Sequence, residues 1–390
     1  MDRIEFRTRA RRLAAFTALL AGTALAAHAA SIGGPAPSHV SLPPVRPAIE
    51  VAFVLDTTGS MSGLLEGAKR KIWSIANQMA SGQPRPEIRI GLIAYRDRGD
   101  AYVTRRFDLT TDIDAIYAHL QELSAQGGGD TPESANQALH EAIEGLSWTP
   151  GQEVYKVVFL VGDAPPHSDY PNDVPYARSV VSARERGIVV NAIQCGSIGA
   201  TTPIWQEIAA SGSGRYVAIR QDGGMLAMTT PQDEELAHLN RALADTVIAY
   251  GAADERAEID AKRERALRAP PAAAASRLAF LSKSGGRVNS GRADLVDAVK
   301  EGSVDAKTLD PDVLPEPLRK LAPAEREAHV KEKLAEREVL QQRIADVSKQ
   351  RDAYVHTEQE RRAAAGDADG FDQQVLEAIR SQAAAKGIAY

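Results

Sequence analysis

The chain has 390 residues, 44% of them hydrophobic and 25% charged, which is the composition of a soluble globular protein with room for two domains or one large domain with extensions. The formal net charge of −6 is modest, and basic residues are scattered or interleaved with acidic ones, so nucleic acid is excluded as an expected partner. Cys195 is the only cysteine, so the chain cannot form an internal disulfide.

The first 30 residues are organised like a secretory signal peptide. Several arginines in "MDRIEFRTRARRL" precede the apolar run "LAAFTALLAGTALA", which is short for a membrane span, and "AHAAS" offers small residues for cleavage. We therefore expect an exported protein, periplasmic or extracellular, with no membrane span in the mature chain. An uncleaved anchor is the alternative interpretation, and Arg11 and Arg12 leave the export route open.

Three further zones follow. Residues 31–48 are rich in proline, glycine and serine and are predicted to be a linker. Residues 49–250 alternate between apolar strand patterns and amphipathic helix patterns, which indicates one α/β domain. Residues 251–390 are charged and alanine-rich, and we predict a mainly α-helical C-terminal region.

The α/β zone has strands and helices in regular alternation. Strands are predicted over 51–55, 87–95, 154–163, 188–196 and 214–219, with a short edge strand over 101–110; helices are predicted over 63–80, 112–123, 132–146, 174–187, 203–212 and 233–250. Such alternation requires right-handed crossovers between parallel strands. The predicted fold is a doubly wound, mostly parallel sheet with helices on both faces.

Ligands of such sheets bind beyond the carboxyl ends of the strands, so the loops there matter most. Three loops, "DTTGS", "GGGDTPES" and "LVGDAPPHSD", bring oxygen-bearing side chains to that edge: Asp56, Thr58, Ser60, Asp130, Thr131 and Asp163. Carboxylates and hydroxyls are hard ligands that suit Mg²⁺, Mn²⁺ or Ca²⁺ and would hold Zn²⁺ or copper poorly. An ion held by few carboxylates keeps a coordination position for an incoming acidic group.

The segment "DTTGSMS" matches the D-x-[ST]-x-S pattern of the metal-ion-dependent adhesion site in von Willebrand factor type A domains, and the later strand ending in "VGD" follows in the same order. Residues 49–250 therefore resemble this family, in a form that looks like a bacterial exported member. The resemblance implies a binding module rather than an enzyme. It also implies a divalent cation, with Mg²⁺ as first choice and Ca²⁺ or Mn²⁺ as alternatives, and a protein or surface ligand that presents a carboxylate.

The resemblance implies metal ligands from all three loops, namely Asp56, Thr58, Ser60, Thr131 and Asp163. Asp56 would bind the ion directly or through water. In the second loop we prefer Thr131, because relatives place a threonine after the glycines, and we keep Asp130 as its rival. If Asp130 bound directly, three acidic groups would crowd the ion, which would favour Ca²⁺ and weaken the attraction for an outside carboxylate.

Simpler interpretations stand beside this one. Aspartate and serine after a strand are ordinary helix caps, and the domain could also be metal-free. His167, four residues after Asp163, is predicted either at the rim of the ligand site or as an ordinary exposed loop histidine. A P-loop lysine and a G-x-S-x-G elbow are both missing from the sequence of the first loop, so it offers no evident nucleophilic catalysis.

The C-terminal region contains one long, charged helix, predicted over 324–362. Its apolar stripe is interrupted at Arg337, where a heptad pattern would need an apolar residue, so we do not expect a sustained coiled coil. We expect this helix to pack on its own neighbours, with a partner-binding helix as the alternative.

Three functions follow as hypotheses. The favoured one is a metal-dependent adhesion or scaffold module that captures an acidic ligand. The second is a metal-dependent hydrolase that uses the same ion to activate water. The third is a structural envelope protein that acts through its C-terminal helices.

Overall fold

The computed structural model describes residues 47–129, 131–225, 228–285, 287–288, 293–364 and 370–390. The predicted signal peptide (1–30), nearly all of the predicted linker and Asp130 lie outside these ranges, so the expectations for them stay predictions.

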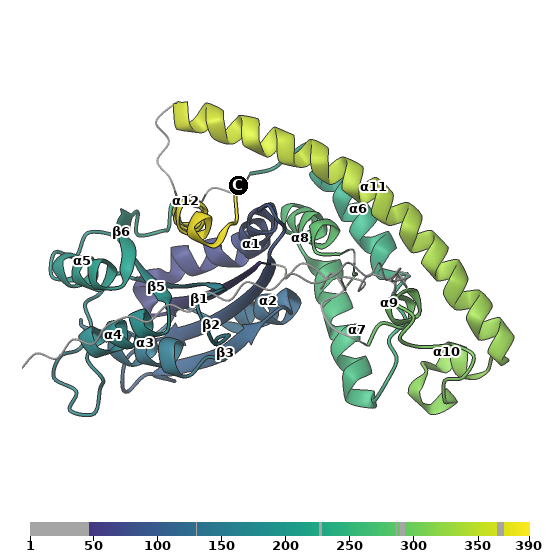
Figure 1. Cartoon of the computed structure of the whole chain (residues 1–390), viewed down its shortest axis with the longest axis horizontal. Helices are drawn as coiled ribbons and strands as arrows, with labels where there is room; N and C mark the ends of the chain where they lie inside the picture. The colour runs from purple at the N-terminus through teal and green to yellow at the C-terminus, as the bar shows by residue number, and fades with distance from the viewer. Residues whose placement is uncertain (1–46, 130, 226–227, 286, 289–292, 365–369) are drawn as a thin grey trace, which may run out of the picture. The chain divides into compact units, whose positions relative to one another are not determined.

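Six strands form one sheet in the order β3-β2-β1-β4-β5-β6 (Figure 1). They are β1 (Ala48–Asp56), β2 (Glu87–Tyr95), β3 (Thr104–Thr110), β4 (Tyr155–Gly162), β5 (Ile188–Cys195) and β6 (Ser213–Ile219). β3 pairs antiparallel with β2 at the sheet edge, and every other pairing is parallel. The predicted mostly parallel sheet and its edge strand are therefore confirmed.

Helices cover both faces of this sheet, as the alternation of apolar side chains in β1 shows. Phe53 and Leu55 join the hydrophobic cluster on one face, whereas Ala52 and Val54 join the cluster on the other. The first face is covered by α1 (Ser62–Met79) and α2 (Ile113–Glu122), and the second by α3 (Ala135–Glu144), α4 (Tyr176–Glu185) and α5 (Thr201–Ser211). A strand buried on both faces needs apolar residues throughout, which explains the run before Asp56.

The rest of the chain is mainly helical, as predicted. Its helices are α6 (Asp233–Ala244), α7 (Ala253–Arg268), α8 (Pro271–Lys283), α9 (Leu295–Lys300), α10 (Glu316–Arg319), α11 (Pro323–Ala364) and α12 (Phe371–Ala383). The long helix predicted over 324–362 is confirmed as α11. Helix α12 packs on α1, β4 and β6 (Figure 1), although no sequence pattern led us to expect it.

The helix predicted over 233–250 is too long, because α6 ends at Ala244. The residues that follow pair with a distant segment instead. Ala249 forms an antiparallel bridge with Asp294, and Leu295 N donates to Ile248 O at 2.8 Å. These partners satisfy backbone groups that a longer helix would have used, and the local pattern of the sequence does not reveal them.

Both regions of the chain contribute to one core. The cluster on the first sheet face contains Phe280 from α8, Ile344 from α11 and Phe371 from α12 beside the residues of β1. Residues 45–390 accordingly form one compact unit. The boundary near residue 250 remains a prediction. Across the described ranges, each helix is too short or too polar to cross a membrane.

Candidate functional site

The first loop of the site begins where β1 brings Asp56 to the carboxyl edge of the sheet as a fully buried residue. Its Oδ1 accepts hydrogen bonds from the backbone N–H of Thr58 at 2.8 Å and from the Thr58 hydroxyl at 2.7 Å. The Thr58 hydroxyl lies 3.3 Å from that of Ser60. Asp56 Oδ2 is buried, and none of the described residues forms a hydrogen bond with it. A buried polar atom without a partner costs free energy, so this oxygen marks a place where a cation would be stabilising.

The third loop places Asp163 directly after β4, which is the neighbour of β1. Asp163 is only 4% exposed. Its Oδ2 accepts a hydrogen bond from Gln221 Nε2 at 2.8 Å, and its backbone oxygen accepts one from the Thr201 hydroxyl at 2.7 Å. The carboxylate therefore has a fixed orientation at the same sheet edge as Asp56.

Gly162, the last residue of β4, makes room for the buried aspartate. A methyl group at this position would lie 2.4 Å from the Tyr95 hydroxyl, 3.0 Å from Asp56 Cβ and 3.1 Å from Asp56 Oδ2. Neither the strand nor the tyrosine beneath it could avoid such a contact without moving. The glycine of "VGD" is thus explained by packing against the site.

The second loop lies against the first, since Gly59 N donates to Gly127 O at 3.2 Å. Thr131, our preferred ligand in this loop, is exposed, and within the described residues no hydrogen bond joins it to Asp56 or Asp163. The second loop is also joined to the third, since Glu133 N donates to Pro165 O at 3.0 Å. Both Thr131 and its rival Asp130, which is not described, remain predictions as metal ligands.

Glu133 is a residue that the sequence analysis missed. It is 3% exposed, and its Oε2 has no hydrogen-bond partner among the described residues. Gly128 has a φ of +75, and a methyl group at this position would lie 2.9 Å from both Glu133 Oε1 and Thr58 Cβ. The glutamate therefore faces Thr58 across the glycine. The sequence pattern "TPES" suggested only a helix start.

Burial and neighbouring charges raise the pKa values of Asp56 and Glu133. Burial raises the pKa of Asp56 to about 7, against the hydrogen bonds from Thr58, and the charge of Asp163 adds to the rise. Burial also raises the pKa of Glu133 to about 9, with further contributions from neighbouring carboxylates, first among them Asp56. Without a cation, Glu133 is thus protonated at neutral pH. A bound cation would favour the ionised forms.

His167 lies in a polar cluster beside the site and is 6% exposed, so it is not the exposed loop histidine of our alternative interpretation. Its Nδ1 lies 2.8 Å from Asp169 Oδ1, and its Nε2 lies 3.3 Å from Asp97 Oδ2. The ring stacks on Tyr170 with 4.0 Å between ring centroids. These contacts hold the histidine within the loop. Whether it meets a ligand stays a prediction.

The oxygen atoms available at the carboxyl edge of the sheet determine which metal ion could bind there. Within the described ranges, no three His, Cys, Asp or Glu side chains form a group able to hold a metal ion by themselves. A cation would therefore depend on the carboxylates of Asp56 and Asp163, on the hydroxyls of Thr58 and Ser60, and on water. This set fits a hard divalent cation such as Mg²⁺, which keeps several waters.

The class of this protein is a doubly wound α/β fold with carboxylate and hydroxyl side chains at the carboxyl edge of its sheet. Residues 50–221 match the family model described as von Willebrand factor A domain. This part of the chain is therefore similar to the von Willebrand factor A family, as the motif in the first loop led us to expect.

Known proteins are similar to parts of this chain. The chain is 35% identical over 99 residues to von Willebrand factor A domain-containing protein 7 of Homo sapiens, which covers 25% of this chain and 10% of that protein. It is 30% identical over 194 residues to hemicentin-2 of Mus musculus, covering 48% of this chain and 4% of that protein. The chain thus spans a tenth or less of the length of these relatives.

Among solved structures, the SpRpn10 VWA domain aligns with a TM-score of 0.34 and 18% identity, covering 45% of this chain and 89% of that one. The strand order and strand pairing of this chain define its fold.

Proposed function

We propose that this protein is an exported binding module that captures a carboxylate of a protein or surface ligand through a divalent cation at the carboxyl edge of its sheet. Von Willebrand factor A domains typically serve in protein adhesion and scaffolding, and residues 50–221 match that family. Residues 251–390 serve as a scaffold or assembly element in this proposal. No residue is assigned a catalytic role.

The observation that carries the proposal is the buried Oδ2 of Asp56, which has no hydrogen-bond partner in the described part of the chain. The other oxygen of this carboxylate, Oδ1, accepts a hydrogen bond from the Thr58 hydroxyl at 2.7 Å, and that hydroxyl lies 3.3 Å from the Ser60 hydroxyl. Burial raises the pKa of Asp56 to about 7, so its ionised form needs a positive charge nearby. A divalent cation would supply that charge and the missing partner together.

In this proposal, charged and neutral oxygens of the site contribute differently to binding the cation. Asp56 and Asp163 balance the two charges of the cation, and Thr58 and Ser60 add neutral oxygens. Thr131 is the proposed ligand of the second loop, with Asp130 as its rival. When bound, the cation supplies a Lewis-acidic centre that an outside carboxylate can reach. Mg²⁺ is our first choice, with Ca²⁺ or Mn²⁺ as alternatives, because this set leaves positions for water.

The first test is thermal unfolding in a chelator and then with millimolar Mg²⁺, Mn²⁺ or Ca²⁺. A cation at about a hundred times its dissociation constant should add about 2.7 kcal/mol to the folded state, which raises the unfolding midpoint by a few degrees. The Asp56→Ala and Asp163→Ala variants should lose this rise. Glu50→Gln is the matched control, because Glu50 is also a buried carboxylate of β1 but lies at the opposite end of the strand.

Carboxylate capture is tested with acetate as the smallest probe. In the presence of the cation, acetate should raise the midpoint of the wild type further and leave that of Asp56→Ala unchanged. If none of the three cations moves the wild-type midpoint, the metal-dependent proposal is wrong. If Asp56→Ala responds as the wild type does, the ion binds elsewhere.

A further inference from the structure

Gln221 connects two of the site's loops from a fourth segment, which the sequence analysis did not consider. It follows β6, and its Nε2 donates to Asp163 Oδ2 at 2.8 Å and to the backbone oxygen of Ser60 at 3.2 Å. One amide group therefore joins the third loop to the first. The residue itself is largely exposed, so its packing does not explain this placement.

The segment that carries Gln221 is fastened on both sides. Arg220 donates to the carboxylate of Asp222, which in turn accepts a hydrogen bond from Gly224 N at 3.0 Å. At the start of α12, Phe371 N donates to Gly223 O at 2.9 Å. The amide of Gln221 is thus presented to the site by a loop with defined geometry.

We propose that Gln221 is a positioning residue of the cation site. By holding Oδ2 of Asp163 and the backbone of Ser60, it fixes the rotation of the carboxylate and the distance between the two loops. Neighbours that orient a metal ligand commonly change metal affinity when they are lost. The inference rests on the proposed function, since it concerns the same cation.

The test uses the full mature chain and Mn²⁺, whose binding is followed by electron paramagnetic resonance. Gln221→Met keeps the length of the side chain and removes its N–H donors. We expect the Mn²⁺ dissociation constant to rise about ten- to a hundredfold, in the range seen when a hydrogen-bond partner of a metal ligand is lost. The spectrum of the bound ion should also change, because the ligands are held less rigidly. A purely structural role would alter unfolding in chelator without altering that spectrum.

Arg215→Met is the matched control. Arg215 lies in β6, before this loop, and its side chain donates to Glu377 of α12 rather than to Asp163. It should bind Mn²⁺ as the wild type does. If Gln221→Met binds Mn²⁺ with unchanged affinity and spectrum while Asp56→Ala does not bind it, the positioning role is wrong and the proposed function stands. If the wild type does not bind Mn²⁺, both are wrong.

Discussion

Asp56 is subject to two opposing effects in the folded chain. Burial disfavours its charge, whereas the hydrogen bonds from Thr58 favour it, and the balance raises the pKa to about 7. In the unfolded chain the same group would ionise near its ordinary value of 3.8. The folded state therefore binds a proton more tightly than the unfolded state between these two values.

The first prediction concerns pH in a chelator. Because the pKa of Asp56 is raised in the folded state, its contribution to stability is fully present below about pH 4 and is lost as the pH rises toward 7. We expect the wild type to lose about 2 to 4 kcal/mol relative to Asp56→Asn over this range. Urea unfolding at several pH values measures it. Parallel pH profiles for the two proteins would contradict the raised pKa.

Gly162 gives a second prediction at the scale of single atoms. In Gly162→Ala the new methyl would lie 2.4 Å from the Tyr95 hydroxyl, so we expect a loss of about 1 to 3 kcal/mol from overpacking. Cation binding should weaken too, because the displaced atoms include those of Asp56. Gly199→Ala is the control, since a methyl there would meet nothing within 4 Å. Equal unfolding midpoints for the two variants would show that the strand accommodates the methyl.

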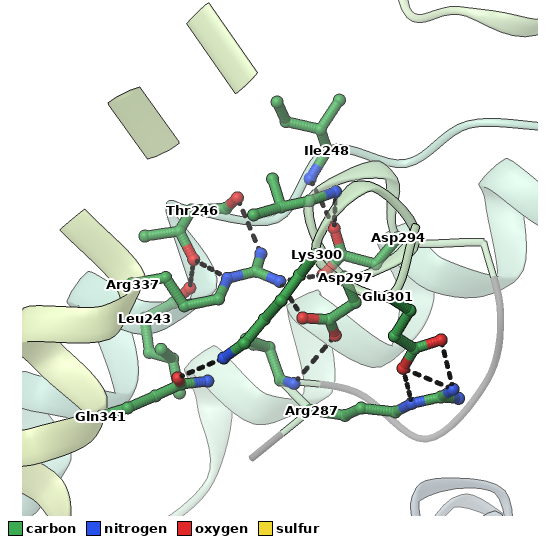
Figure 2. Close-up of polar contacts among 12 residues, drawn as sticks. Leu243, Thr246, Ile248, Arg287, Asp294, Asp297, Lys300, Glu301, Arg337 and Gln341 are labelled. Atoms are coloured by element: carbon green, nitrogen blue, oxygen red, sulfur yellow. Dashed lines mark hydrogen bonds and ion pairs between the residues drawn. The ribbon is translucent and has the colours of Figure 1, made fainter. Parts of the chain in front are cut away.

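At the scale of elements, Arg337 explains how α11 is attached. Figure 2 shows its side chain reaching from α11 toward Asp294, Asp297 and Thr246. It is fully buried, lies 2.9 Å from Asp294 Oδ2 and 2.5 Å from Asp297 Oδ1, and donates to the Thr246 hydroxyl at 2.9 Å. Arg337, which interrupts the heptad pattern, is therefore an internal anchor: it attaches α11 to other segments of the same chain. This agrees with our expectation that the helix packs on its own neighbours.

The third prediction follows from that burial. Arg337→Met should lower the free energy of unfolding by about 3 to 5 kcal/mol, because it leaves two buried carboxylates without their counter-charge. Arg343→Met on the same helix is the control. Arg343 is 54% exposed and pairs with Glu235, so its loss should cost at most about 1 kcal/mol. Chemical denaturation of both variants makes the comparison, and similar losses would argue against the anchor.

At the scale of the whole molecule, the C-terminal helix completes the core of the α/β sheet. Phe371 of α12 lies 6.1 Å from Phe53 of β1, measured between ring centroids. The Tyr155 hydroxyl of β4 donates to Gln382 at 2.6 Å, and Ala389 N donates to Gln83 O at 2.8 Å. A chain that ended at residue 250 would leave uncovered the part of this apolar face that α12 contacts.

The fourth prediction tests that dependence. Phe371→Ala should lower stability by about 3 to 5 kcal/mol and broaden or lower the unfolding transition of the entire chain. Glu377→Ala, an exposed change in the same helix, should have little effect. The measurement is thermal unfolding followed by near-ultraviolet circular dichroism, which reports on packed aromatic rings. If Phe371→Ala unfolds as Glu377→Ala does, α12 is not part of the cooperative core.

Some of the site could be predicted from the sequence because it depends on local patterns. The apolar run of β1 and the polar residues after it place Asp56, Thr58 and Ser60 at a strand end, and the apolar run of β4 does the same for Asp163. Parallel neighbouring strands end at the same edge of the sheet, so the structure brings these residues together. Their role as metal ligands remains a prediction.

The amino-acid sequence by itself determined the strands, most helices and the residues at the carboxyl edge, because each depends on the spacing of apolar and polar residues nearby. Only the tertiary structure decided the burial of Glu133, the contact of Gln221 with Asp163, the docking of Arg337 and the place of α12. These features depend on contacts between residues far apart in the chain. No local spacing encodes such contacts, since they arise only when the surfaces that bury those side chains come together.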